Sequence, residues 1–341
     1  MMAWIARICL AISMLCLGAC ASVDEEAPTI AFVGVTVIAV YGEPHLDNQT
    51  VLVRGDRIVA IGPANRVRVP AHAQRLGGAG QILAPGLTDM HVHIFEANDG
   101  VLFLANGVTT VRNMSGRPET LALAAEINAG ARPGPRIYSS TPIIDGPQAE
   151  WENPRAVRTP EEMRQRIADV ARPEYVGVKL YENLSAESFA AGVATARERG
   201  MQVYAHVPHA MTLADVLALR IDSIEHLTGF DRALAPNSRS DWDEERWAEA
   251  DMRNVAPIAR SVAASGVWND STLITAVGAR EAFADMAAAE SAPLYRYATP
   301  RLRRHWRAIQ AAEAEERDPA LMWAMTQRAH TVRVDMVRAL H

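Results

Sequence analysis

Between residue 87 and about residue 275, short apolar and β-branched runs alternate with longer segments whose apolar residues recur at helical spacing. This alternation is typical of βα units, which build a parallel sheet. Capping signals mark the helices: Thr159-Pro-Glu-Glu162 begins one helix, Ser185 caps a second that ends at Gly200, and Gly130 ends a third. The pattern predicts strands at 87–93, 109–113, 136–139, 177–181, 202–206, 223–226 and 267–271, and a final helix from Asp318.

Residues 29–83 follow a different pattern, with β-branched runs and no helical period. The runs 50–54 and 57–61 are separated only by Gly55-Asp56, which is typical of a tight hairpin. Residues 29–40 and 81–83 complete a small β unit ahead of the βα region.

Composition and charge exclude some classes of protein. The chain has 341 residues, of which 49% are hydrophobic and 22% charged, an ordinary globular composition that allows one large and one small domain. The net charge is -6 with acidic and basic residues interspersed, so no nucleic-acid partner is expected.

The first 20 residues have the pattern of an export signal. Arg7 precedes an apolar run over residues 8–17 that is too short to span a bilayer. Leu17-Gly-Ala-Cys20 resembles the lipobox of bacterial lipoproteins, which implies lipidation of Cys20; Ala21 after it implies sorting to the outer membrane. An ordinary cleavage site at the same place is the alternative. We therefore expect an exported, periplasmic protein that meets a membrane only through this anchor.

Histidines and one lysine stand at the ends of four predicted strands. His91 and His93 project from the same face of an extended chain. Lys179, His206 and His226 end three later strands, so these side chains are expected at one rim of a parallel barrel. Each histidine taken singly is more often a structural residue, and Lys179 alone would reach solvent, but the recurrence favours a metal site.

Together these segments resemble the amidohydrolase superfamily, in its imidazolonepropionase-like and prolidase-like branch. The segments that carry the resemblance are 84–93, 105–112, 179–181, 206–208 and 224–227. The resemblance implies an α/β fold, a (β/α)8 TIM-like barrel with a small β-sandwich. The expected organisation is a lipoprotein-type signal peptide at 1–20, a β-sandwich portion at 29–83 and a hydrolase barrel at 84–341.

The resemblance also implies ligands and roles. His91 and His93 would bind one divalent metal, His206 and His226 a second, and a carboxylated Lys179 would bridge them, with Zn²⁺ as the expected ion. A water activated by the metals would attack an amide carbon. Tyr181 would orient a substrate carboxylate or stabilise the oxyanion, or form a plain aromatic wall, and Asp89 would support an imidazole.

The chain departs from this family at its C-terminal end. Relatives carry a metal-binding aspartate at the end of strand eight. None of the aspartates late in this chain follows such a strand in the sequence; they are Asp270, Asp285, Asp318 and Asp335. We therefore expect an incomplete barrel that lacks its C-terminal strand, from a truncated chain, and a loss of roughly 10²–10⁴ in rate without the proton shuttle.

Three functions remain open at this stage. The first is a metal-dependent hydrolase of a small amide, such as an N-acyl amino acid, a dipeptide or a cyclic amide. The second is a non-catalytic envelope lipoprotein that keeps the scaffold, and the third is a related deaminase, which would need no lysine on strand four. An oligomer is compatible with all three.

Overall fold

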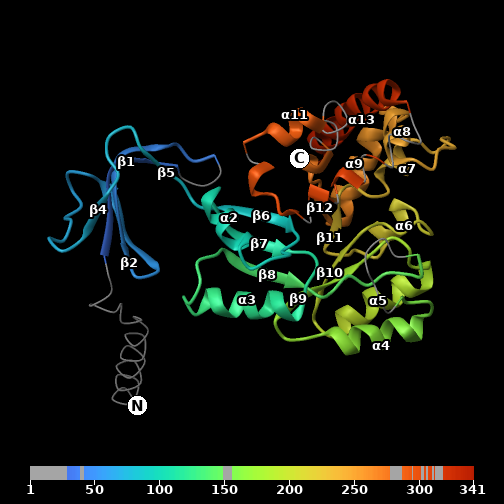
Figure 1. The fold of residues 1–341 in the computed structure, drawn as a ribbon, viewed down its shortest axis with the longest axis horizontal. Coiled ribbons are helices and arrows are strands. Elements are labelled where there is room, and N and C mark those ends of the chain that lie inside the picture. Colours follow the sequence, from blue (N-terminus) through green and yellow to red (C-terminus); the bar gives the residue numbers. More distant parts are fainter. Residues whose placement is uncertain are drawn as a thin grey trace, which may run out of the picture. The chain divides into compact units, whose positions relative to one another are not determined.

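The computed structural model describes residues 29–38, 42–148, 156–276, 286–293, 295–300, 303–304, 306–308, 311 and 318–341. The chain divides into two compact units, Met1–Gly86 and Leu87–His341 (Figure 1). The predicted signal peptide, with Cys20, lies outside the described residues.

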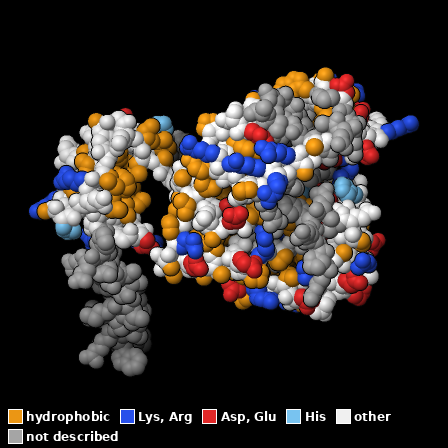
Figure 2. All heavy atoms as spheres, viewed as in Figure 1, with side chains coloured by type: hydrophobic (Ala, Val, Ile, Leu, Met, Phe, Trp, Pro, Cys, Tyr) orange, Lys and Arg blue, Asp and Glu red, His pale blue; other side chains and the backbone are white. Residues whose placement is uncertain are grey.

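The described part of the first unit forms one mixed sheet. Its strands are β1 (Thr29–Val37), β2 (Leu46–Arg54), β3 (Arg57–Pro63), β4 (Gln74–Leu76) and β5 (Ile82–Leu83). The predicted hairpin is confirmed, because β2 pairs antiparallel with β3, while β4 and β5 pair parallel with β1. Ala31 and Val51 are buried, whereas Ile58 and Ile82 are exposed, and Figure 2 shows hydrophobic side chains at the surface of this sheet.

The second unit contains a parallel sheet of seven strands among the described residues. Its strands are β6 (Leu87–Val92), β7 (Val108–Asn113), β8 (Arg136–Ser140), β9 (Tyr175–Leu180), β10 (Gln202–Ala205), β11 (Ser223–Glu225) and β12 (Trp268–Asp270). They follow one another in chain order, which confirms the predicted βα succession. The sheet curls into a nearly closed barrel with β6 and β12 as its edges (Figure 1). No described residue beyond β12 adds an eighth strand to it.

Helices alternate with these strands and continue beyond them. They are α2 (Asp99–Ala105), α3 (Pro118–Asn128), α4 (Pro160–Val170), α5 (Ala186–Glu198), α6 (Leu213–Ala218), α7 (Phe230–Leu234), α8 (Asp243–Ala248), η1 (Met252–Asn254), α9 (Val255–Ser265), α11 (Met286–Ser291), η2 (Tyr295–Tyr297) and α13 (Pro319–Leu340). Thr159 and Ser185 accept hydrogen bonds from the first turns of α4 and α5, as the sequence predicted, and Asp318 does the same for α13. None of the described helices is both long and apolar enough to cross a membrane.

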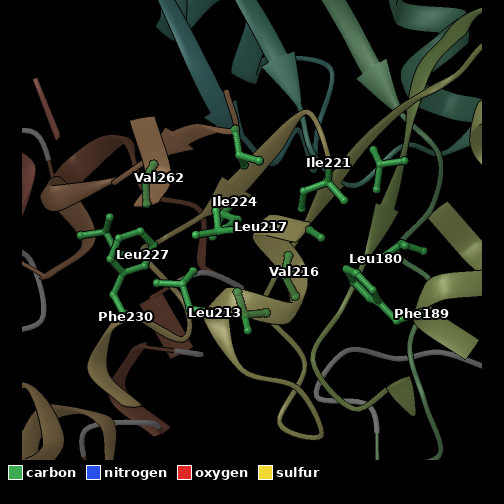
Figure 3. Close-up of a cluster of buried hydrophobic side chains, with 14 of the residues drawn as sticks. Leu180, Phe189, Leu213, Val216, Leu217, Ile221, Ile224, Leu227, Phe230 and Val262 are labelled. Atoms are coloured by element: carbon green, nitrogen blue, oxygen red, sulfur yellow. The ribbon is translucent and has the colours of Figure 1, made fainter. Parts of the chain in front are cut away.

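The main hydrophobic core lies between this sheet and its helices (Figure 3). Leu180 and Ile224 come from strands, and Phe189, Val216 and Val262 pack against them from helices. Successive side chains of a strand point to opposite faces. Since Leu180 faces the helices, its neighbours in the chain face the interior of the barrel, and the site is built there.

Candidate metal centre

The predicted site residues lie at one end of the parallel sheet. His91 is in β6 and His93 follows its last residue, Lys179 is in β9, and His206 and His226 come directly after β10 and β11. The C-terminal ends of parallel strands meet at one rim, so residues up to 135 positions apart in the chain are brought together there.

The four imidazoles are neighbours in space. The ring centroid of His91 lies 5.4 Å from the ring centroid of His93 and 4.2 Å from that of His226. The rings of His206 and His226 are 5.0 Å apart. The sequence-predicted convergence of these side chains is therefore present in the structure.

Lys179 and Tyr181 share this rim. The side chain of Lys179 has no exposed surface, and its Nζ lies 5.6 Å from the centroid of the Tyr181 ring. The Tyr181 ring stacks on His206 with centroids 3.9 Å apart. Lys179 does not reach solvent, so the alternative of an ordinary strand-end lysine does not describe it.

Three of the imidazoles have an oxygen atom beside Nδ1. His91 Nδ1 lies 2.6 Å from Glu225 Oε2, and His226 Nδ1 lies 2.5 Å from Thr272 Oγ1. His206 Nδ1 has a longer contact of 3.4 Å with Glu182 Oε2. Partners of this kind fix the tautomer and orientation of metal-binding histidines, because they leave Nε2 for the ion.

Polar atoms without hydrogen-bond partners gather in the same place. Among the described residues, nothing accepts from or donates to Nε2 of His91, Nε2 of His206 or Nζ of Lys179, although all three are buried. Buried polar atoms are nearly always satisfied, so a cluster of unsatisfied nitrogens needs a ligand. The donor set fits a divalent metal of the zinc type, which imidazoles suit.

Burial keeps the imidazoles neutral, as metal binding requires. It lowers the pKa of His91, His206 and His226 well below the usual range, and the nearby Lys179 lowers each further. The pKa of His93 falls to about 4 for the same reasons, burial first. Burial also lowers the pKa of Lys179 to about 8, against the opposing effect of Glu225.

The backbone is strained where β11 ends. His226 and Leu227 have φ values of 59° and 55°, in the left-handed region that residues other than glycine rarely adopt. The peptide N–H of His226 donates to the carbonyl of Asp270 at 2.7 Å, which holds this turn against β12. Such strain occurs mostly at functional sites, where the surrounding structure maintains it.

The interior of the barrel forms a cavity of about 1440 Å³ next to these groups. His91, His93, His226 and Asp270 line it at the rim, and its wall continues to residues such as Gln202 at the beginning of β10. The imidazoles of His91, His93 and His226 are therefore accessible to a small molecule.

Two sequence expectations need correction. Asp89 does not support an imidazole: its Oδ1 accepts from the backbone N of His91 at 3.1 Å. Asp270 was set aside from its sequence context, yet it ends β12 and offers an oxygen within 4.8 Å of ligand atoms of His91 and Glu225. Of the other late aspartates, Asp318 is the N-cap of α13, Asp335 lies within that helix, and residue 285 lies outside the described residues.

Sequence reasoning also missed Arg112 and Glu225. Arg112 follows Val111 near the end of β7, and Glu225 is the last residue of β11, directly before His226. A charged residue in a short apolar strand is the signal that could have identified both, because such a side chain is buried only with a partner.

The comparisons with known proteins agree with this architecture. Residues 82–317 match the model of the amidohydrolase family. Adenine deaminase 3 of Rhizobium johnstonii is 39% identical over 92 residues, which are 26% of this chain and 15% of that protein. The chain thus spans a small part of the curated relatives that it matches.

Solved structures resemble most of the chain. A bottromycin amidohydrolase has a TM-score of 0.65 and 24% identity, covering 93% of this chain and 67% of its own. A Xaa-Pro dipeptidase with bound methionine has a TM-score of 0.56 and 18% identity, covering 75% and 70%. At these identities the likeness shows the fold alone.

Proposed function

We propose that this chain, which belongs to the amidohydrolase family, hydrolyses the carbon–nitrogen bond of a small amide with the help of divalent metal. The substrates we propose are N-acyl amino acids, dipeptides or cyclic amides. The observation that carries this proposal is the cluster of buried, unpartnered nitrogen atoms on His91, His206 and Lys179.

We assign the ligands by their place in the cluster. His91 and His93, from β6, would hold one ion, and His206 and His226 the other. When bound, two Zn²⁺ ions would polarise the amide carbonyl and lower the pKa of a water molecule toward neutrality.

Lys179 would bridge the two ions after carboxylation. Its neutral amine nitrogen forms a bond to the carbon of CO₂, one C=O bond becomes C–O⁻, and the amine proton leaves to solvent. Burial assists this step because it lowers the pKa of Lys179 to about 8, so more of the amine is neutral near physiological pH than in an exposed lysine. Carboxylation also replaces a buried cation by an anion that the ions neutralise.

Tyr181 would act on the substrate. Its ring is fixed against His206, so its hydroxyl has few alternative positions. We assign to this hydroxyl a hydrogen bond to the substrate carboxylate or to the oxyanion that forms at the amide carbon.

Metal analysis and a substrate screen of the purified protein test the proposal. We expect about two Zn²⁺ ions per chain and turnover of at least one N-acyl amino acid or dipeptide. The control is Glu126→Gln, since the half-exposed Glu126 of α3 pairs with Arg132 and contacts none of the proposed ligands. Metal without turnover of any such amide would instead support a non-catalytic lipoprotein that keeps the scaffold.

The local identity to an adenine deaminase supports a second candidate, a deaminase. Adenine therefore belongs in the same screen. Lys179→Ala separates the two enzymes, because a single-metal deaminase keeps its ion without this lysine, whereas the two-metal hydrolase does not.

A further inference from the structure

Glu225, the last residue of β11, is a fully buried acid. Its side chain has no exposed surface. Its Oε2 lies 2.6 Å from His91 Nδ1, and its Oε1 accepts from Ser223 and, at 3.1 Å, from Arg112. A carboxylate removed from water is stable only with such partners, so this one is fixed in position by three of them.

Arg112 holds the carboxylate from the opposite strand. Its Nε donates to the carbonyl of Met90 at 2.7 Å, and its guanidinium lies 4.5 Å from the centroid of the Tyr204 ring. Its Nη2, the atom that donates to Glu225, also lies 3.7 Å from Asp270 Oδ2. One guanidinium therefore contacts both edge strands, β6 and β12, as well as β10 and β11, and leaves Glu225 little freedom to turn.

The chemistry of the contact determines the state of His91. A carboxylate accepts hydrogen bonds and does not donate them, so the proton of the neutral imidazole must lie on Nδ1. Nε2 then keeps its lone pair, and Nε2 is the buried atom of His91 without a hydrogen-bond partner.

We infer that Glu225, held by Arg112, is a positioning residue that fixes His91 as the Nδ1–H tautomer and thereby presents Nε2 to the metal. This inference deepens the proposed function and rests on it for the identity of the ligand. Glu225 itself belongs to no ligand set assigned above. Asp89, the acid nearest His91 in sequence, contacts only its backbone in the structure.

A test in the metal-free protein is independent of the proposed function. In protein labelled with ¹⁵N-histidine, the His91 signal is identified by its absence from His91→Gln. We expect the chemical shifts of an Nδ1–H imidazole in the wild type. In Glu225→Gln, whose amide can also donate to Nδ1, we expect a mixture of tautomers or the Nε2–H form. An Nε2–H tautomer in the wild type would overturn the inference.

Zn²⁺ titration against a chelator tests the consequence for binding. Glu225→Gln should weaken the site by about 10–100-fold. The matched control is Asp222→Asn, which removes a carboxylate from the same part of the chain and should leave Zn²⁺ affinity unchanged. Wild-type affinity and an unchanged tautomer in Glu225→Gln would refute the positioning role while leaving the proposed function standing.

A second variant covers a failure of Glu225→Gln to fold. Glu225→Asp keeps the charge beside Arg112 but withdraws the carboxylate from His91 by one methylene, so it should also lower Zn²⁺ affinity. If the wild type binds no Zn²⁺, the proposed function fails, and the tautomer of His91 in the metal-free protein still decides the inference.

Discussion

The ring of Tyr181 stacks on the ring of His206 at 3.9 Å, with an angle of 28° between their planes. Tyr181 therefore has two separable properties, a ring that braces a proposed ligand and a hydroxyl that is assigned to the substrate. Tyr181→Phe removes only the hydroxyl. We expect it to keep Zn²⁺ affinity and to lose about 10²-fold in kcat on the best amide of the screen.

Tyr181→Ala serves as the comparison, because it also removes the ring. It should lower Zn²⁺ affinity in addition to kcat. Wild-type kcat in Tyr181→Phe would show that the residue is an aromatic wall without a role in the reaction.

Lys179 is expected to destabilise the metal-free protein. Burial lowers its pKa from 10.5 to about 8. Below pH 8 the lysine is protonated in both states, and the charged ammonium is less stable in the folded protein than in the unfolded chain. This difference corresponds to on the order of 3 kcal/mol near neutral pH. Lys179→Met should therefore raise the thermal midpoint of the metal-free protein while reducing bound Zn²⁺ to at most about one ion per chain. A lower midpoint would contradict the unfavourable burial of this amine.

The stability of the metal-free protein should fall in mild acid. The folded-state pKa values of His91, His93, His206 and His226 all lie below the ordinary 6.5, with His93 at about 4. Below pH 6.5 the unfolded chain binds more protons, so stability decreases as the pH falls. The free energy of unfolding then falls by up to about 1.4 kcal/mol per pH unit for each histidine that stays neutral in the folded state.

Thermal melts from about pH 7.5 to about pH 5 would measure this slope. His93→Asn should make it shallower, because the variant lacks one of the four groups. A midpoint that does not change over this interval would show that the imidazoles are not held neutral.

The export signal predicted for residues 1–20 leads to a prediction about location. If Cys20 is lipidated, the protein should fractionate with the outer membrane, and Cys20→Ser should appear in the soluble periplasmic fraction or remain unprocessed. Cys9→Ser, a change within the apolar run, is the control and should leave the distribution as in the wild type. Equal distribution of the wild type and Cys20→Ser would favour the ordinary cleavage site.

Much of the barrel could be predicted from local patterns. Apolar alternation located strands β6 to β12 to within a few residues, and the caps at Thr159 and Ser185 located the beginnings of two helices. The positions of His206 and His226 at strand ends also followed from the sequence. These features depend on neighbours along the chain, so a single sequence contains them.

The partners of the imidazoles could not be predicted in this way. Glu225 lies 134 residues from His91, and the two meet because the sheet curls until β11 faces β6. Asp270 joins them for the same reason, although its sequence context gave no sign of it.

The sequence by itself thus determined which strands end in histidine or lysine side chains and that these side chains gather at one rim. Only the tertiary structure decided which oxygen faces Nδ1 of His91, His206 and His226, and hence which nitrogen of each ring is left for a metal. The physical reason is that strand order follows from connectivity and alternation, whereas contacts across a barrel depend on its curvature. That curvature is set by the packing of all the helices and strands together.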